Sequence, residues 1–181
     1  MTVNPAGSKT FTVYVRIPNR TTSELYIPDT TINGLLSLKV NGRELHPVIE
    51  HGYAVIRRTW KKGDKIDLEL PMTIQRVRAD DKIEADRGHI ALRYGPLLYN
   101  VETADNQDIS KSIGNAPLTL EWKANFLHGV MAIKGRWADG SPLLAVPNYS
   151  RLNRVPVAAT PDESGHAPAP PVSTVWIKDL P

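Results

Sequence analysis

The amino-acid sequence predicts an all-β protein, an antiparallel β-sandwich of the jelly-roll kind with little helix. The first observation is that short runs of alternating apolar and polar residues recur about every 10 residues, as in sandwich strands. The second is that glycine, proline, asparagine and aspartate separate these runs, as turns require. The third is that residues 1–100 contain no long segment with the 3.6-residue period of an amphipathic helix.

The strand pattern is clearest near the N-terminus, at residues 9–18. Phe11, Val13 and Val15 alternate there with more polar neighbours, which indicates a strand with one buried face. The polar, threonine-rich residues 19–33 follow, and we expect a loop there with at most one edge strand.

Two turn signals organise the next strands. Asn41-Gly42 favours a tight hairpin turn, and Lys62-Gly63-Asp64 marks a second turn. The strands expected before residue 88 are 35–40, 44–49, 52–60, 65–70 and 74–78.

Residues 88–102 read as two short strands joined by a corner at Gly95-Pro96. Apolar and aromatic residues alternate with polar ones on both sides of this dipeptide, and Tyr94 and Tyr99 belong to the apolar sets. Proline cannot donate to a strand ladder and keeps the preceding residue extended. We therefore expect a bulge here, or a point where the chain crosses from one sheet to the next.

The composition changes after Glu102. Residues 103–115 are polar and predict a surface loop, and residues 155–171 are rich in proline, alanine, serine and glycine, which is typical of an exposed loop. Further strands are expected at 117–122, 129–134, 143–147 and 173–178. We expect two packed β modules, residues 1–102 and 103–181, with one sandwich carrying an appended sheet as the alternative.

Composition excludes several classes of function. The 181 residues include no cysteine, which rules out disulfides, thiolate zinc sites, iron–sulfur clusters and cysteine nucleophiles. The net charge is only +3 and the basic residues are scattered, so no nucleic-acid partner is expected. No apolar run reaches the roughly 20 residues of a membrane span, and no signal peptide is expected at Met1. We expect a soluble protein and assign no compartment.

The sequence offers no catalytic, cofactor-binding or metal-binding residues. Asp80, Asp81, Glu84 and Asp86 share one loop, where charged residues are usually solvated. The five histidines lack the spacing of metal ligands, and neither a nucleophile elbow nor a phosphate-binding glycine loop is present. The tryptophans could form a sugar-stacking platform, or each could be a half-buried sandwich residue; they are Trp60, Trp122, Trp137 and Trp176.

Several segments, taken together and in order, resemble one family. They are FTVYVRIP (11–18), KVNG (39–42), GYAVIRRTWKKGDKIDLELPM (52–72), GHIALRYGPLLYNVE (88–102), AVPNYSRLNR (145–154) and VWI (175–177). This order resembles the C-terminal β-sandwich region of glycoside hydrolase family 127, the β-L-arabinofuranosidase-like enzymes. The resemblance covers nearly the whole chain.

The resemblance implies an accessory role in carbohydrate degradation. In that family an N-terminal (α/α)₆ barrel carries a cysteine nucleophile, a glutamate acid/base and a cysteine-ligated zinc. None of these residues has a counterpart here, so this chain alone is expected to be inactive. Its implied partner is a catalytic barrel in the same or a partner chain. A stand-alone module that binds plant or other polysaccharide, or that forms a homo-oligomer, is the alternative.

The chain departs from the family pattern near its end. The family commonly has a tryptophan before the Asn-Arg pair, and Arg151 stands at that place, before Asn153-Arg154. A proline-rich insertion then separates Arg154 from residues 175–177.

Aromatic and arginine residues are the usual anchors of interfaces. The residues that we expect at an interface are Tyr94, Tyr99, Tyr149, Arg154 and Trp176. The alternative for each is packing inside the sandwich. Arg154 follows a short strand, where it could clamp a loop lined by carbonyl or carboxylate groups.

Overall fold

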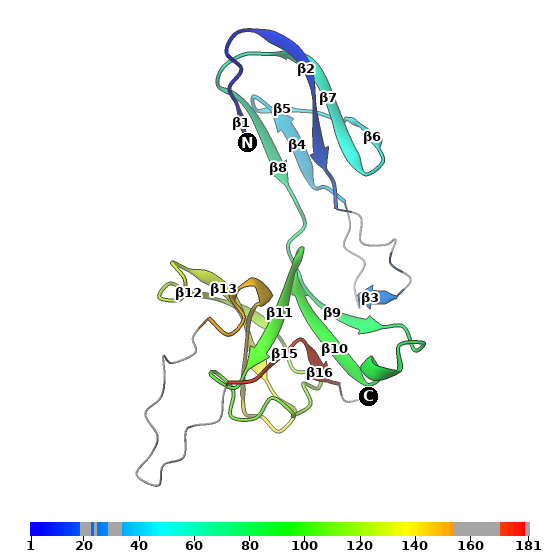
Figure 1. Cartoon of the computed structure of the whole chain (residues 1–181), viewed down its shortest axis with the longest axis vertical. Coiled ribbons are helices and arrows are strands. Elements are labelled where there is room, and N and C mark those ends of the chain that lie inside the picture. The colour runs from blue at the N-terminus through cyan, green and yellow to red at the C-terminus, as the bar shows by residue number, and fades with distance from the viewer. Residues whose placement is uncertain (19–22, 24, 29–33, 154–170, 180–181) are drawn as a thin grey trace. The chain divides into compact units, whose positions relative to one another are not determined.

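The computed structural model describes residues 1–18, 23, 25–28, 34–153 and 171–179. As predicted, the described chain is all-β, with sixteen strands, two short 3₁₀ turns and no α-helix (Figure 1). None of its helical segments is long and apolar enough to cross a membrane.

The chain forms two compact units, which are considered separately. The first unit contains residues 1–23 and 31–72, and the second contains residues 24–30 and 73–181. The division thus falls after Met72, whereas the sequence pattern placed it after Glu102. The reason is that the three strands between residues 74 and 102 pair with one another, with the short strand at residues 26–28 and with strands from residue 142 onward, and not with the strands of the first unit.

The first unit is a sandwich of two antiparallel sheets. One sheet has the order β1 (Thr2–Val3), β8 (Asp64–Glu69), β4 (Ser37–Val40) and β5 (Arg43–Glu44). The other has the order β2 (Lys9–Arg16), β7 (Tyr53–Trp60) and β6 (Val48–Glu50). Its core contains Val15, Ile17, Leu38, Val40, Ala54, Ile56, Trp60 and Ile66, which come from both sheets.

The Asn41-Gly42 hairpin is confirmed. Both residues have positive φ, 51° and 76°, and Val40 pairs with Arg43 across a two-residue turn of type I′. The return strand expected at 44–49 is instead divided at His46-Pro47. Its first part, β5, pairs with β4, and its second part, β6, joins the other sheet beside β7. Pro47 explains the division, because it has no backbone N–H to continue the ladder.

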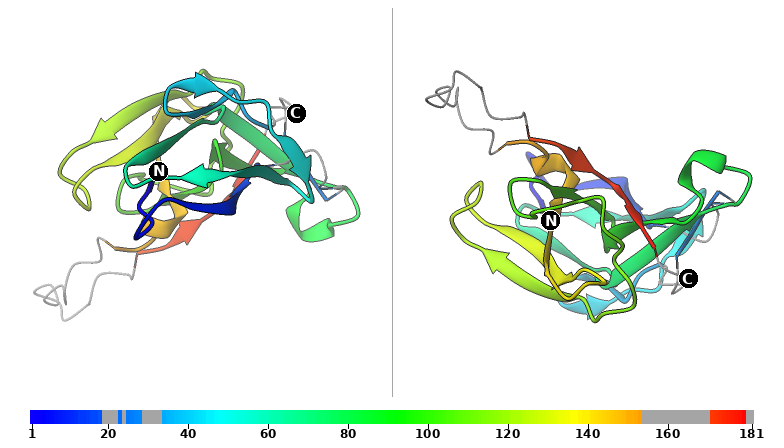
Figure 2. Two further views of the ribbon diagram at one scale, coloured as in Figure 1. Left: turned by 90° about the horizontal axis from the view of Figure 1, so that it is seen from above. Right: turned by 90° about the horizontal axis from the view of Figure 1, so that it is seen from below.

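The second unit is a longer sheet folded over its own core. The strand order is β12 (Thr119–Lys123), β13 (Val130–Arg136), β14 (Pro142–Pro147), β11 (Leu97–Glu102), β10 (His89–Tyr94), β9 (Ile74–Ala79) and β3 (Tyr26–Pro28). The β12–β13 hairpin forms one edge of this sheet and β3 forms the other (Figure 2). The short 3₁₀ turns are η1 (Glu84–Asp86) and η2 (Asn148–Ser150).

The sheet of the second unit bends at the Gly95-Pro96 turn, which joins β10 to β11. Strands β10 and β11 share only two residue pairs, those next to the turn, after which β10 pairs with β9 and β11 with β14. Gly95 has a φ of 54°, which suits the first position of a type II′ turn, and proline supplies the negative φ of the second. The structure thus has a tight turn between two paired strands of one sheet at this dipeptide, where the sequence pattern predicted a bulge or a crossing between two sheets.

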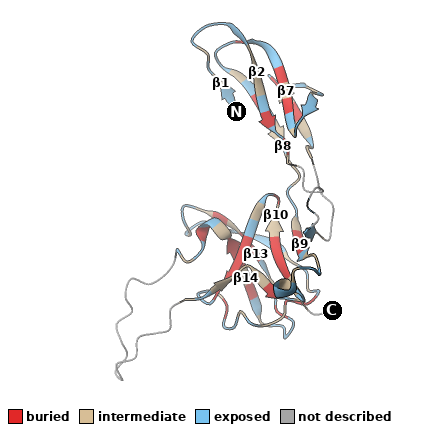
Figure 3. Cartoon of the chain, turned by 45° about the vertical axis from the view of Figure 1, so that its right-hand side comes forward, coloured by how far each residue is buried: buried red, intermediate tan, exposed pale blue. Residues whose placement is uncertain are grey.

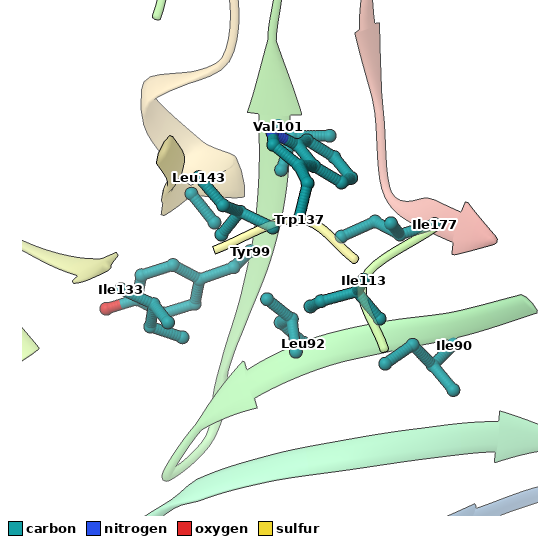
Figure 4. Close-up of a cluster of buried hydrophobic side chains, with 10 residues drawn as sticks. Ile90, Leu92, Tyr99, Val101, Ile113, Ile133, Trp137, Leu143 and Ile177 are labelled. Atoms are coloured by element: carbon teal, nitrogen blue, oxygen red, sulfur yellow. The ribbon is translucent and has the colours of Figure 1, made fainter. Parts of the chain in front are cut away.

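The C-terminal strands close the other end of this fold. β15 (Ser173–Thr174) pairs with β11, and β16 (Trp176–Lys178) pairs with β10. The core that they help to enclose (Figure 4) contains Ile90, Leu92, Tyr99, Val101, Ile113, Ile133, Trp137, Leu143, Ala145 and Ile177. Buried positions accordingly run along β10, β13 and β14 (Figure 3).

The polar segment 103–115 is only in part the expected surface loop. Ile113 is fully buried in the core, and its backbone N–H donates to the carbonyl of Lys178 at 2.9 Å. Ile113 thus anchors the loop against β16, and the half-buried Ile109 packs against the same core.

Candidate functional site

Four of the sequence-selected residues, Tyr94, Tyr99, Tyr149 and Trp176, lie in the described part of the second unit, and the three tyrosines lie near one another. Tyr94 ends β10, Tyr99 lies on β11, and Tyr149 lies in η2. Tyr149 is 65% exposed and Tyr94 is half-buried, whereas Tyr99 is fully buried. Tyr99 therefore packs inside the unit and is not available at an interface, and Tyr149 is the member of the group that faces solvent.

Tyr99 is fixed by its phenol as well as by packing. Its hydroxyl donates to the carbonyl oxygen of Met131 on β13 at 2.6 Å. The pKa of Tyr99 is raised to about 12, mainly by burial and to a smaller extent by the neighbouring phenols of Tyr149 and Tyr94. The phenol is therefore neutral at physiological pH, and it acts as a donor in the core.

The turn that presents Tyr149 is held by a buried carboxylate. Glu102, at the end of β11, is 1% exposed, and its Oε1 accepts from the backbone N–H of Leu152 at 2.8 Å. The same oxygen accepts from Nδ2 of Asn100 at 3.1 Å. Ser150 closes the turn by donating from Oγ to the carbonyl of Pro147 at 2.6 Å. These buried bonds give η2 a fixed position on β11.

Arg151 supplies a second anchor for this turn. Its Nε donates to Oγ of Ser173 at 2.5 Å, and its Nη2 donates to the carbonyl of the same residue at 3.3 Å. Arg151 thus connects η2 to β15 through polar contacts.

Asn106 was not selected from the sequence, yet it joins three segments. Its Nδ2 donates to the carbonyls of Glu102 and Leu144, each at 2.9 Å, and its Oδ1 accepts from the N–H of Leu144 at 3.0 Å. An asparagine in a polar loop carries no signal of such a role, because its partner Leu144 lies on a strand 38 residues further along the sequence.

Trp122 adds a second exposed ring to this part of the unit. It is 58% exposed on the edge strand β12, directly opposite Met131, whose carbonyl binds Tyr99. The ring lies close over Gly129, where an added Cβ would come within 2.1 Å of it. We use the name aromatic surface for the solvent-facing parts of Tyr94, Trp122 and Tyr149, each considered by itself.

The remaining tryptophans do not form a common platform. Trp60 is fully buried in the core of the first unit, and Trp137 is buried in the core of the second. Trp176 is half-buried on β16 and stacks on Tyr26 of β3, with ring centroids 6.1 Å apart and planes at 28°. Arg154 lies outside the described residues.

The chemistry available on the aromatic surface is that of binding. It offers aromatic faces and phenol groups, which suit the apolar faces of sugars and the anchors of protein interfaces. The carboxylates of residues 80–86 lie on a separate loop, where Asp80 accepts from the N–H of Lys82 and Glu84 pairs with Arg87 at 3.8 Å. The described residues hold no group of three or more histidine, aspartate and glutamate side chains placed to bind a metal ion.

Comparison with known families identifies the class of protein. The model of the β-L-arabinofuranosidase GH127 middle domain matches residues 1–72, and that of the glycoside hydrolase family 127 C-terminal domain matches residues 74–160. The chain therefore belongs to glycoside hydrolase family 127. The border between the two matches coincides with the border between the compact units at residues 72 and 73.

The individual relatives are longer proteins. The chain is 28% identical over 138 residues to the non-reducing end β-L-arabinofuranosidase of Bifidobacterium longum subsp. longum, which is 72% of this chain and 20% of that enzyme. The crystal structure of a GH127 β-L-arabinofuranosidase from Geobacillus stearothermophilus T6 matches with a TM-score of 0.71 and 27% sequence identity. The match covers 99% of this chain and 28% of the Geobacillus chain. A further GH127 β-arabinofuranosidase, at 24% identity and a TM-score of 0.77, has the same fold over 96% of this chain and 28% of its own.

Proposed function

We propose that this chain is a non-catalytic accessory region of a family 127 β-L-arabinofuranosidase, which supports a catalytic barrel in carbohydrate degradation. The observation that carries the proposal is that the middle-domain and C-terminal-domain matches follow one another over residues 1–160. The chain spans only 20% of the curated relative and 28% of the solved chains. Chemistry of the family kind needs a cysteine nucleophile, and this chain has no cysteine.

An activity assay tests this proposal. The purified chain is incubated with β-L-arabinofuranosides, with the Bifidobacterium longum enzyme as the positive control. We expect no turnover above the buffer. Turnover that persists through a second purification, and that scales with the amount of chain, would overturn the proposal.

The exposed aromatic surface favours a second candidate, a module that binds polysaccharide. Trp122 and Tyr149 present more than half of their surface, and aromatic faces stack on sugar rings. Affinity electrophoresis through arabinan and arabinogalactan gels tests this candidate. Retardation that is lost in Trp122→Ala and Tyr149→Ala, but kept in a Tyr14→Ala variant of the first unit, would support it. Unchanged mobility on every glycan would count against it.

A further inference from the structure

The sandwich of the first unit is open along one side. Strand β1 ends one of its sheets and β2 ends the other, and in the described chain each of these strands pairs with a neighbour on one side only. A groove of about 730 Å³ lies along them, and its floor is apolar. The apolar residues along it include Val3, Phe11, Val13 and Ile66.

The free edge of β2 is long and regular. The strand has eight residues, and all of them pair with β7 without a bulge. The ladder continues to Ile17, whose N–H donates to the carbonyl of Gly52 at 2.9 Å. Because hydrogen-bonded pairs alternate in an antiparallel ladder, the odd-numbered residues of β2 bind β7.

The even-numbered residues therefore direct their backbone groups to the open side. Thr10, Thr12 and Tyr14 present N–H and C=O groups there, which is the template that an added strand uses. The odd-numbered side chains Phe11 and Val13 are half-buried and face the groove. The free backbone edge of β2 thus borders the apolar groove, because Lys9, Phe11 and Val13 of the same strand line it.

We propose that this groove receives an extended segment of a family 127 polypeptide from the part that lies outside this chain. The inference rests on the proposed function, because the added segment would come from the portion that carries catalysis. The source is large enough, since the matched region is only 20% of the Bifidobacterium longum relative. The segment would pair with residues 10–14 of β2 and place alternate apolar side chains on Phe11 and Val13. It would thereby join the accessory region to the rest of the enzyme by strand addition.

Peptides from that relative are the probe. Overlapping peptides of about 12 residues, longer than the free edge of β2, cover its sequence outside the 138 matched residues. They are displayed on an array and exposed to the whole labelled chain. We expect bound peptides to show strict alternation of apolar and polar residues. No bound peptide, or bound peptides with a helical 3.6-residue pattern, would overturn the inference.

A matched pair of variants tests in solution whether the peptide pairs with the free edge of β2. The peptide used is the one that binds most strongly on the array. Thr12→Pro removes an N–H on the free edge of β2 and leaves the ladder with β7 intact, because proline is tolerated where the N–H faces away from the neighbouring strand. Thr12→Val keeps that N–H. We expect Thr12→Pro to weaken binding about tenfold or more and Thr12→Val to leave it unchanged. Equal binding by the two variants would overturn the inference.

Hydrogen exchange on the unaltered chain gives an answer even where Thr12→Pro does not fold. The peptide should slow exchange of the amides of Thr12 and Tyr14 about tenfold or more. The amides of Val13 and Val15, which already bind β7, should change little. Protection at neither Thr12 nor Tyr14 would contradict the inference.

The alternative occupant of the groove is a second copy of this chain. If sizing chromatography without peptide shows a dimer that Thr12→Pro dissociates, the occupant is a second copy and the proposed source of the strand is wrong. Failure of the proposed function is a separate result, because turnover of β-L-arabinofuranosides by this chain is measured without any peptide.

Discussion

The phenol of Tyr99 illustrates how one buried group makes stability depend on pH. Its folded pKa of about 12 lies above the unfolded value near 10, first because burial penalises the phenolate and then because Tyr149 and Tyr94 lie close. The folded state therefore holds this proton more tightly. Its contribution to stability is complete below about pH 10 and is lost as the pH rises toward and through 12.

We therefore predict that alkali destabilises the second unit between about pH 10 and pH 12 by about 2 kcal/mol through Tyr99. Denaturant unfolding at pH 8 and at the highest pH where the fold persists measures the loss. Tyr99→Phe is the control, because it removes the titrating group and costs about 1 kcal/mol for the bond to Met131. An equal alkaline loss in Tyr99→Phe and in the unaltered chain would assign the effect to other groups.

Glu102 gives a second prediction at this scale. Its carboxylate accepts from the N–H of Leu152 and from Asn100, and it is 1% exposed. Glu102→Leu leaves both donors buried without this acceptor, so we expect a loss of about 2 kcal/mol or more in unfolding free energy. Glu102→Gln retains an acceptor oxygen and should lose less. Exposed Glu44→Leu is the matched control, and a loss in that variant as large as in Glu102→Leu would contradict the argument.

The aromatic residues could be predicted from the sequence more easily than the polar residues that hold them. Tyr94 and Tyr149 stand out by residue type. Asn100 and Glu102 lie on the polar side of the alternation in β11, which reads as a solvent face. Both faces of β11 are buried at this end, because η2 and the segment with Asn106 cover it. That cover is a tertiary contact, and no local pattern indicates it.

The strands could be predicted where alternation is strong and turn residues are specific. Local chemical causes explain three features: the regular alternation in β2, the Asn41-Gly42 turn and the Gly95-Pro96 turn. The choice of which strand pairs with which has no such local cause. β6 leaves the sheet of β5 at His46-Pro47. β9 and β10 pair with each other, with β3 and with β16, and not with strands of the first unit, so the unit border lies at residue 72.

At the scale of elements, the C-terminal strand β16 should be essential to the second unit. Ile177 is 1% exposed and pairs with Ile90, so Ile177→Ala removes core volume where little can collapse into the gap. We predict a loss of about 2–4 kcal/mol, as for other buried isoleucines. Thermal unfolding measures it. The neighbouring Lys178→Ala, an exposed side chain on the same strand, should change stability by less than about 0.5 kcal/mol.

At the scale of the whole molecule, two separate cores raise the question of how unfolding is divided. The first core centres on Trp60 and Ile66, and the second on Trp137 and Ile133. The chain passes between the units at residues 23 and 24, 30 and 31, and 72 and 73. Each unit has its own buried residues and its own closed set of strand pairs, which is what an independent cooperative unit requires.

We therefore predict two thermal transitions that respond separately to core mutations. Ile66→Ala should lower the transition of the first unit and leave the other in place, because it removes about 2–4 kcal/mol from one core only. Ile133→Ala should do the reverse. Differential scanning calorimetry measures both transitions, and tryptophan fluorescence of Trp60→Phe and Trp137→Phe variants assigns each to its unit. If either mutation lowered both transitions equally, the units would form one cooperative structure. In that case the two units would match two family domains because of their evolutionary origin, and the match would not mean that each unit folds independently.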